Sequence, residues 1–200
     1  MSPPRDPNLT RQHILEVSAE EMRVNGFKAA SLSDIINRAG VSKGALYHHF
    51  SNKQELGYAV FEEIYIAAFL ADWDLPLSQE RPLKAVSDWY TQFAEQVTEA
   101  ELGEGCPVCN IATEMSGVDE GFRNMTMKMF ATVQKRFAAS IKAAQDKGQV
   151  KPDIDPNAVA SFLIAAMQGI MAQGKYARDL EEFKSTIKCM ADYVRSLQLS

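Results

Sequence analysis

The sequence predicts an all-α protein in which a small N-terminal helix-turn-helix domain of three helices precedes a larger helical domain. Three observations support this fold class. Apolar residues recur at helical spacing, no segment alternates as a strand does, and glycine or proline stands at several expected helix boundaries. The 200 residues are enough to bury a substantial core in one large or two modest domains.

We expect about nine helices. They should begin near residues 8, 32, 43, 51, 82, 106, 120, 156 and 180. Gly26 should end the first helix, Ser51 should cap the fourth with Gln54 completing a capping box, and Asp74-Leu75-Pro76 should end that fourth helix. The expected organisation is a disordered arm at 1–7, a helix-turn-helix domain at 8–62 and a C-terminal domain at 63–200.

The motif at residues 31–50 predicts a short helix, a tight turn and a second helix. Ser31 can cap the first helix, Gly40 permits the sharp turn, and Ser42 offers its hydroxyl to the free amides that follow. The second helix opens on Lys43-Gly44-Ala45, a small and basic leading turn. A helix that enters the major groove of DNA needs this plan, because bulk there would hold its backbone away from the bases.

This motif defines the candidate DNA-binding residues. We expect base contacts from the leading turn and phosphate contacts from polar side chains around it. The complete candidate set is Ser31, Ser33, Ser42, Lys43, Gly44, Ala45, Tyr47, His48 and Lys53.

Residues 8–62 resemble the N-terminal domain of the TetR family of bacterial regulators. The resemblance rests on Ile14-Leu15, Asn25-Gly26-Phe27, Ser31-Leu32-Ser33-Asp34-Ile35, Ala39-Gly40-Val41-Ser42-Lys43-Gly44, Leu46-Tyr47-His48-His49-Phe50 and Lys53-Gln54-Glu55-Leu56. It implies a repressor that binds double-stranded operator DNA with inverted half-sites. It also implies that a small-molecule inducer, sensed by the C-terminal domain, releases the operator.

Charge is spread unevenly along the chain. Residues 1–60 carry seven Lys and Arg against six Asp and Glu, and residues 61–200 carry fourteen against twenty. Because the N-terminal part is nearly neutral and the rest of the chain is acidic, DNA must be bound through local contacts rather than through the net charge of the protein.

Other classes of protein are less consistent with the sequence. We expect a cytoplasmic protein without a membrane partner, because neither a signal peptide nor a long apolar run is apparent and three cysteines argue against a disulfide framework. We expect no cofactor and no metal site. Catalysis is disfavoured because the histidines, His13, His48 and His49, all lie in the DNA-binding part, away from any cysteine nucleophile.

The last two expected helices carry the candidate homodimer interface. One is apolar nearly all round, and the other carries a stripe with spacings of four, three and four residues, so a monomer would leave one apolar face wet. The candidate residues are Phe162, Met167, Ile170, Phe183, Ile187, Met190 and Val194. TetR-like proteins pair these helices into a four-helix bundle, which fits a two-fold operator.

Gly105-Cys106-Pro107-Val108-Cys109 is the candidate sensing segment. Cys106 stands at the start of a short expected helix, where free amides and the helix dipole favour a thiolate. From the local sequence alone, a reactive pair and two packing residues are equally good interpretations. One Cys-X-X-Cys pair without further ligands does not predict a zinc site.

The same segment resembles the electrophile-responsive branch of the TetR family, the N-ethylmaleimide reductase repressors. That resemblance implies that Cys106 is the sensor and that Lys175 is a buried partner near its thiolate. A Cys106–Cys109 disulfide competes with the Cys106–Lys175 link, because Cys109 departs from the pattern of that branch.

A reversible apolar inducer is the alternative to covalent sensing. Several large apolar side chains of the C-terminal domain are candidates for a pocket between helices, or for ordinary core. They are Trp89, Tyr90, Phe93, Phe122, Met125 and Met129.

Overall fold

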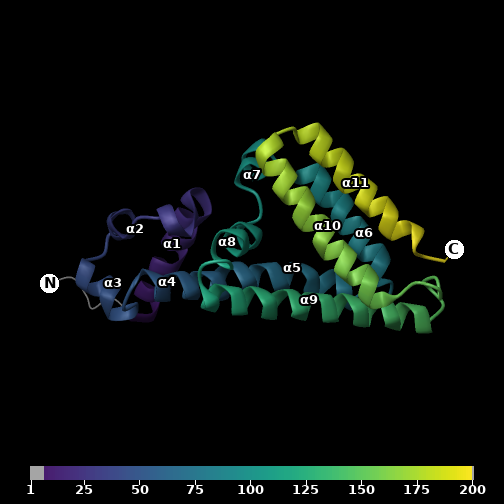
Figure 1. Ribbon diagram of the computed structural model, residues 1–200, viewed down its shortest axis with the longest axis horizontal. Coiled ribbons are helices and arrows are strands. Elements are labelled where there is room, and N and C mark those ends of the chain that lie inside the picture. The colour runs from purple at the N-terminus through teal and green to yellow at the C-terminus, as the bar shows by residue number, and fades with distance from the viewer. Residues whose placement is uncertain (1–6, 200) are drawn as a thin grey trace. The chain divides into compact units, whose positions relative to one another are not determined.

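The computed structural model describes residues 7–199 and confirms the all-α class (Figure 1). The helices are α1 (Pro7–Ala29), α2 (Leu32–Ala39), α3 (Lys43–His49), α4 (Lys53–Ala59), the π-helical η1 (Val60–Ile66), α5 (Ala67–Ser78), α6 (Pro82–Gln96), α7 (Glu99–Glu104), α8 (Pro107–Met115), α9 (Glu120–Asp146), α10 (Pro156–Ala177) and α11 (Leu180–Ser196). The expected helices are all present, with α4, η1 and α5 forming one of them, and α7 is additional.

The chain folds into two compact units. Unit 1 contains the chain as far as Ala68 together with Asn110–Thr126, and unit 2 contains Phe69–Cys109 and the chain from Met127 onward. Helix α8 therefore passes from unit 2 into unit 1, and α9 passes back. The domain boundary expected after residue 62 therefore assigned residues 110–126 to the C-terminal domain, whereas they belong to unit 1.

The helix ends of unit 1 follow from glycine conformations and side-chain caps. Gly26 interrupts α1 at φ 78° and ψ 168°, and Gly40 ends α2 in the left-handed region at φ 61°, where a side chain would be strained. Ser31 Oγ accepts from the Asp34 amide at 3.3 Å, and Ser42 Oγ accepts from the Ala45 amide at 3.1 Å. The expected arm at 1–7 lies outside the described residues, apart from the first residue of α1.

The cap expected at Ser51 is wrong by one residue. Asn52 is the N-cap of α4, and its side-chain oxygen accepts from the Glu55 amide at 2.8 Å. The Glu55 carboxylate reaches back to the Ser51 amide at 2.8 Å, so the box is formed by different residues. Gln54 instead donates to Asp119 at 2.5 Å. The Gln54 side chain, which the local sequence assigned to the cap, therefore binds Asp119, a residue distant in the sequence.

The fourth helix also runs further than expected. It continues through η1 and α5 to Ser78, with Pro76 inside α5. Proline removes one backbone hydrogen bond, but Pro76 is buried and lies two residues before the helix end. Near that end the Leu75 carbonyl accepts from the side chains of Ser78 at 3.0 Å and Gln79 at 3.1 Å.

An aromatic cluster forms the centre of unit 1. The ring of Phe122 lies 5.0 Å from that of Phe27, 4.8 Å from that of Tyr58 and 5.6 Å from that of Phe61, with tilted or edge-on geometry. Phe122 is fully buried. Such contacts add to the stabilisation from area burial, so the first turns of α9 are part of the same core as the N-terminal helices.

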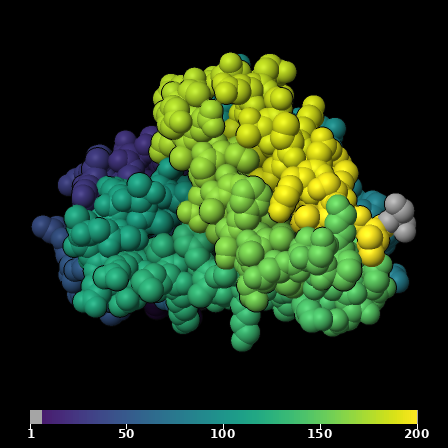
Figure 2. Space-filling model, turned by 45° about the vertical axis from the view of Figure 1, so that its right-hand side comes forward, coloured from purple at the N-terminus to yellow at the C-terminus, as the bar shows by residue number. Residues whose placement is uncertain are grey.

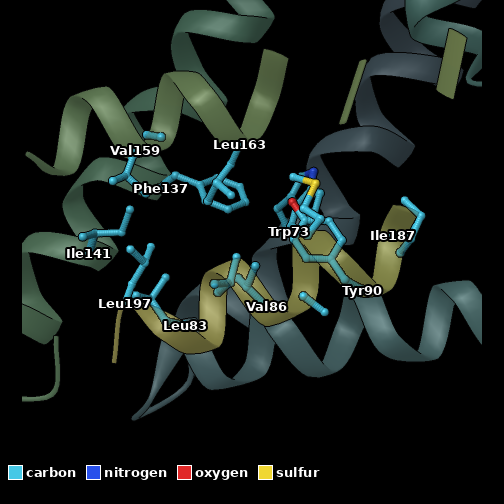
Figure 3. Close-up of a cluster of buried hydrophobic side chains, with 14 of the residues drawn as sticks. Trp73, Leu83, Val86, Tyr90, Phe137, Ile141, Val159, Leu163, Ile187 and Leu197 are labelled. Atoms are coloured by element: carbon cyan, nitrogen blue, oxygen red, sulfur yellow. The ribbon is translucent and has the colours of Figure 1, made fainter. Parts of the chain in front are cut away.

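Unit 2 has its own larger core, in which Trp73, Tyr90 and Phe137 turn toward one another (Figure 3). Helix α11 packs along α6 and buries its apolar stripe there. The stripe residues assigned to a dimer interface are therefore core residues of a single chain. They are Phe183, Ile187, Met190 and Val194.

No helix within residues 7–199 is long and apolar enough to cross a membrane.

Candidate nucleic-acid interface and ligand pocket

The N-terminal end of α3 presents a low, exposed surface. Ser42, Lys43 and Gly44 are exposed, while Ala45 is half-buried. Because the Ser42 hydroxyl oxygen accepts the Ala45 amide, its own hydrogen remains available to an acceptor outside the protein. The Lys43 ammonium lies 5.8 Å from the centre of the Tyr47 ring. The leading turn is thus free to approach another molecule closely, with one cation at its edge.

Polar side chains flank this turn as expected. Tyr47 is 42% exposed, and Ser33 and His48 are also exposed. Ser31 is half-buried and caps α2, which leaves its hydroxyl hydrogen for a phosphate oxygen. These residues lie on α2 and α3 or at their ends, and all belong to unit 1.

Lys53, expected to contact phosphate, has partners inside the protein. Its ammonium donates to the Lys28 carbonyl at 2.9 Å and lies 5.1 Å from the centre of the Phe27 ring. Burial lowers the pKa of Lys53, and the Glu114 carboxylate opposes this shift. In this structure Lys53 holds the end of α1, and only its remaining donors are available for DNA.

Arg11 fixes the base of the interface. Its guanidinium forms a two-point ion pair with Glu63, at 2.7 and 2.5 Å, and lies 5.2 Å from the centre of the Phe50 ring. This pairing raises the pKa of Arg11 and lowers the pKa of Glu63. A bidentate geometry restricts orientation as well as distance, so α1 is held in register with η1 and with the end of α3.

Glu114, in the last turn of α8, binds the broken end of α1. Its two carboxylate oxygens accept from the backbone amides of Phe27 and Lys28, each at 2.8 Å. The interruption of α1 at Gly26 frees these amides, and a carboxylate is a strong acceptor for them. The sequence gives no sign of this role for Glu114, because nothing local connects residues 86 or 87 positions apart.

Asp119, at the start of α9, forms a second connection inside unit 1. Its carboxylate accepts from the Tyr58 hydroxyl at 2.7 Å, from the Gln54 amide at 2.5 Å and from the Phe122 backbone amide at 3.0 Å. The hydrogen bond to Asp119 raises the pKa of Tyr58. The end of α8 and the start of α9 are thereby tied to α1 and α4 respectively.

Unit 2 contains a cavity of about 550 Å³. Aromatic rings dominate its wall, with carboxylate and amide side chains among them. The aromatic residues are Phe69, Trp73, Trp89, Tyr90, Phe93, Phe130 and Phe137, and the polar ones are Asp72, Gln92, Gln96, Glu101 and Gln168. This volume suits a small organic molecule.

Three of the six candidate pocket residues lie in the wall of this cavity. Trp89, Tyr90 and Phe93 line it. Phe122 and Met125 do not, because the start of α9 belongs to unit 1. Met129 is buried in unit 2 but lies outside the cavity wall. The helical spacing of apolar residues along α9 correctly predicted a buried face. It did not predict that the first turns of α9 belong to unit 1 and the later turns to unit 2.

Both cysteines of the candidate sensing segment are free thiols in the cavity wall. The pKa of Cys106 is lowered to about 7, because its sulfur accepts a hydrogen bond from the Cys109 thiol. Burial opposes this shift, the amides of Cys109 and Val108 reinforce it, and the Asp72 carboxylate opposes it. The pKa of Cys109 is raised, because its thiol is the donor and is itself buried. The two pKa shifts therefore favour the thiolate of Cys106 over that of Cys109.

Lys175 does not have the place expected for it. Its side chain is exposed and is absent from the cavity wall that contains Cys106. The expectation of a buried lysine beside the thiolate is wrong in this structure. Cys189 is exposed on α11, outside the same wall. Within residues 7–199, no group of three or more His, Cys, Asp or Glu side chains is arranged to hold a metal ion.

Both parts of the chain match models of known families. Residues 14–60 match bacterial regulatory proteins of the tetR family, and residues 80–190 match the tetracyclin repressor-like C-terminal domain. The HTH-type transcriptional repressor DhaR of Mycobacterium sp. (strain GP1) is 28% identical over 86% of this chain and 85% of its own length. The transcriptional regulator AcuR of Cereibacter sphaeroides is 29% identical over 85% of this chain and 78% of its own length.

Solved structures agree with this assignment. Regulatory protein TetR from Rhodobacter sphaeroides is 26% identical with a TM-score of 0.79, covering 92% of this chain and 98% of its own. A TetR regulator from Chloroflexus aurantiacus J-10-FL, 21% identical, has a TM-score of 0.83 over 98% of this chain and 100% of its own. Escherichia coli NemR in its reduced form, 24% identical, has a TM-score of 0.80 over 95% and 97%. The last two likenesses show the fold alone, and NemR is one of several distant neighbours rather than a special relative.

Two substitutions on α3 should separate affinity from sequence discrimination. Lys43→Ala should cost about 1–3 kcal/mol of operator binding and relax the preference among operator variants, since a base contact is lost. Tyr47→Phe should cost about 0.5–1.5 kcal/mol on every sequence alike, since only a phosphate hydrogen bond is lost. Fluorescence anisotropy with the chain's own upstream DNA and its point variants measures both effects.

Lys135→Ala is the matched control, because Lys135 is an exposed lysine of unit 2. It should leave binding unchanged. A change in the ranking of operator variants by Tyr47→Phe, but not by Lys43→Ala, would show that these two roles are reversed.

Removing the Glu114 carboxylate should loosen unit 1. Glu114→Gln leaves one acceptor for two amides, and Glu114→Ala leaves none. The free energy of unfolding should fall by about 1–3 kcal/mol for alanine, and by less for glutamine. Urea denaturation measures this, with Glu62→Ala, an exposed glutamate of the same unit, expected to change it by no more than about 0.5 kcal/mol. Equal effects of Glu114→Ala and Glu62→Ala would contradict the role given to these bonds.

Proposed function

Since the chain belongs to the TetR family and is a DNA-binding transcriptional repressor with a ligand-sensing C-terminal domain, we propose that it senses a reactive electrophile or oxidant through Cys106. It is a regulator and not an enzyme. Release of an inverted-repeat operator is the expected response. The observation that carries this proposal is the thiol of Cys106, which lies in the wall of a ligand-sized cavity and has its pKa lowered to about 7.

The thiol pair supports reaction with electrophiles. A lowered pKa raises the thiolate fraction of Cys106 near neutral pH, and the thiolate is the nucleophile. With an α,β-unsaturated carbonyl compound, a bond forms between the Cys106 sulfur and the β-carbon, and the π electrons move to the enolate. A proton from the Cys109 thiol or from water then completes the adduct. The added group occupies cavity volume next to the first turn of α8.

For oxidants, the geometry supports Cys109 rather than Lys175 as the second residue. Hypochlorous acid would convert the Cys106 thiolate to a sulfenyl chloride with loss of hydroxide. The Cys109 thiol would then displace chloride and lose its proton, forming a disulfide. Cys109 already hydrogen-bonds to the Cys106 sulfur, whereas Lys175 is exposed and outside the cavity wall.

Helix α8 is the proposed route from sensor to DNA-binding unit. It starts at Pro107 in the cavity wall, and it contains Glu114, which holds the Phe27 and Lys28 amides in unit 1. A helix is stiff along its axis, so a displacement of the first turn is transmitted to the last. Because a two-fold operator presents half-sites about 34–36 Å apart, a small reorientation of each α3 helix is sufficient for release.

We also propose that the repressor is a homodimer, with an interface that differs from the one first expected. Figure 2 shows α10 and α11, in yellow-green and yellow, side by side on one open face. On α10 the exposed residues include a stripe with spacings of four, three, four, three and four. Its members are Ala158, Phe162, Ala165, Gly169, Ala172 and Tyr176.

The composition of this stripe supports close packing of helices. Alanine and glycine allow two backbones to approach, while Phe162 is 51% and Tyr176 is 78% exposed and can bury large area on association. The Phe162 ring also packs edge-on against Tyr193 of α11, at 5.1 Å. Of the residues first assigned to the interface, only Phe162 belongs to this stripe, because Met167 and Ile170 pack against the unit 2 core.

A reversible apolar inducer is the alternative, and it too has a specific observation in its favour. The rings of Trp89 and Phe93 are stacked at 5.3 Å with an interplanar angle of 12°, in the wall of the cavity. The outer face of such a stacked pair can bind a flat apolar molecule without any covalent step. The two modes of induction differ only in whether Cys106 is required.

Substitution of Cys106 distinguishes these modes. N-Ethylmaleimide should release wild-type protein from its operator, whereas Cys106→Ser should stay bound. Modification of Cys106 should accelerate as pH rises through about 7, because the thiolate fraction rises there. Cys109→Ala should slow it near neutral pH, since loss of the hydrogen-bond donor raises the pKa of Cys106. Mass spectrometry and gel shift measure the two effects.

Cys189→Ser serves as the control and should respond as wild type does, because Cys189 lies outside the cavity wall. If Cys106→Ser is also released by N-ethylmaleimide, covalent sensing at this residue is excluded.

The dimer is tested by a single charged side chain on α10. Ala165→Arg should convert a dimer into a monomer at micromolar concentration, because a buried unpaired charge costs several kcal/mol. Light scattering measures the mass. Ala139→Arg places the same charge on an exposed position of α9 and should remain dimeric. A monomeric wild-type protein, or a dimeric Ala165→Arg protein, would refute this interface.

A further inference from the structure

The charges of the cavity wall are all of one sign. The wall contains the carboxylates of Asp72 and Glu101 and the neutral amides of three glutamines, and it contains no lysine, arginine or histidine. Hydrogen bonds from the Thr98 amide and hydroxyl lower the pKa of Glu101 and keep it ionised. An anion that enters this cavity would lose water and find no opposite charge. A cation would find the carboxylate of Asp72 and, at an exposed position, that of Glu101, which also accepts the Thr98 amide and hydroxyl as part of the α7 cap.

Asp72 is the carboxylate best placed to select a ligand. It lies on α5 beside Trp73, and within residues 7–199 no ion pair or hydrogen bond is found for it. Its side chain is exposed to solvent as well as lining the cavity. Partial burial raises its pKa, so an incoming positive charge would stabilise its ionised form. Asp74, two positions along the same helix, contrasts with it, because Asp74 pairs with Arg136 at 2.6 Å.

The aromatic part of the wall favours the same class of ligand. The rings of Trp73 and Trp89 lie 4.6 Å apart, and Trp89 stacks on Phe93. The faces of indole and phenyl rings carry partial negative charge, which attracts cations and also binds flat apolar groups. Rings and carboxylates therefore act in the same direction.

We propose that the cavity of unit 2 selects organic cations that combine a flat apolar body with an ammonium-type charge, with Asp72 as the counter-ion. Neutral molecules of the same shape bind more weakly, and carboxylates, sulfonates and phosphates are rejected. This rests on the proposed function, which places the inducer in this cavity, and it concerns the binding that precedes any reaction at Cys106.

Three probes of matched shape test the proposal. They are phenyltrimethylammonium, the neutral isostere tert-butylbenzene and the anion benzenesulfonate. The protein's two tryptophans, Trp73 and Trp89, both lie in the cavity wall, so quenching of intrinsic fluorescence reports binding there. At low salt, wild-type protein should bind the cation at least fivefold more tightly than the neutral probe, and the anion at least tenfold more weakly than the cation.

Substitutions identify the counter-ion. Asp72→Asn should weaken binding of the cation at least threefold and leave the neutral probe unchanged. Asp74→Asn, the matched control on the same helix, should change neither. Binding of the anion as tight as that of the cation, no quenching by any probe, or an unaltered cation affinity in Asp72→Asn would each overturn the proposal.

The result is separable from the role of Cys106. None of the three probes is an electrophile, so Cys106→Ser should show the same order of affinities as wild type. A failure of covalent sensing appears in operator release and leaves this order intact. A failure of charge selection changes the order while leaving release by N-ethylmaleimide intact.

Discussion

The arrangement of unit 1 depends on two backbone amides that α1 cannot satisfy by itself. The interruption at Gly26 frees the amides of Phe27 and Lys28, and the Glu114 carboxylate binds both. The hydrogen bond of the Phe27 amide is half-buried, and an amide withdrawn from water requires an acceptor, so the break in α1 requires a partner from elsewhere in the chain. That partner is at the end of α8. Unit 1 therefore includes the end of a helix that begins in unit 2, and this continuity supports the proposed route from Cys106 to the DNA-binding helices.

The wall of the unit 2 cavity contains both the proposed reactive thiol, Cys106, and the proposed ligand-selecting carboxylate, Asp72. The Cys109 thiol and two backbone amides stabilise the Cys106 thiolate, while the Asp72 carboxylate opposes it. A bound cation would offset that opposition, because it would compensate the Asp72 charge. Selection by charge and activation of the thiol are thus electrostatically linked, and both act at the start of α8.

Local patterns predicted the elements of the chain well and their partners poorly. The caps at Ser31 and Ser42 and the breaks at Gly26 and Gly40 were confirmed, because each depends on neighbours within four residues. Gln54 was misassigned, because Asp119 binds it from 65 positions away. The stripe on α11 was read correctly as apolar, but α6 covers it within the same chain. Periodicity shows that a face is buried, and it does not show what buries it.

The sequence by itself determined the helical class, the helix-turn-helix at 31–50 and the place of Cys106 directly before a helix. These follow from backbone conformation, capping and helix polarity, which act over short distances along the chain. The tertiary structure alone decided that Phe122 belongs to unit 1, that Lys175 is exposed and that Asp72 lines the cavity. Each of these outcomes depends on how helices far apart in the sequence pack together, and packing is a property of pairs of surfaces that no single segment contains.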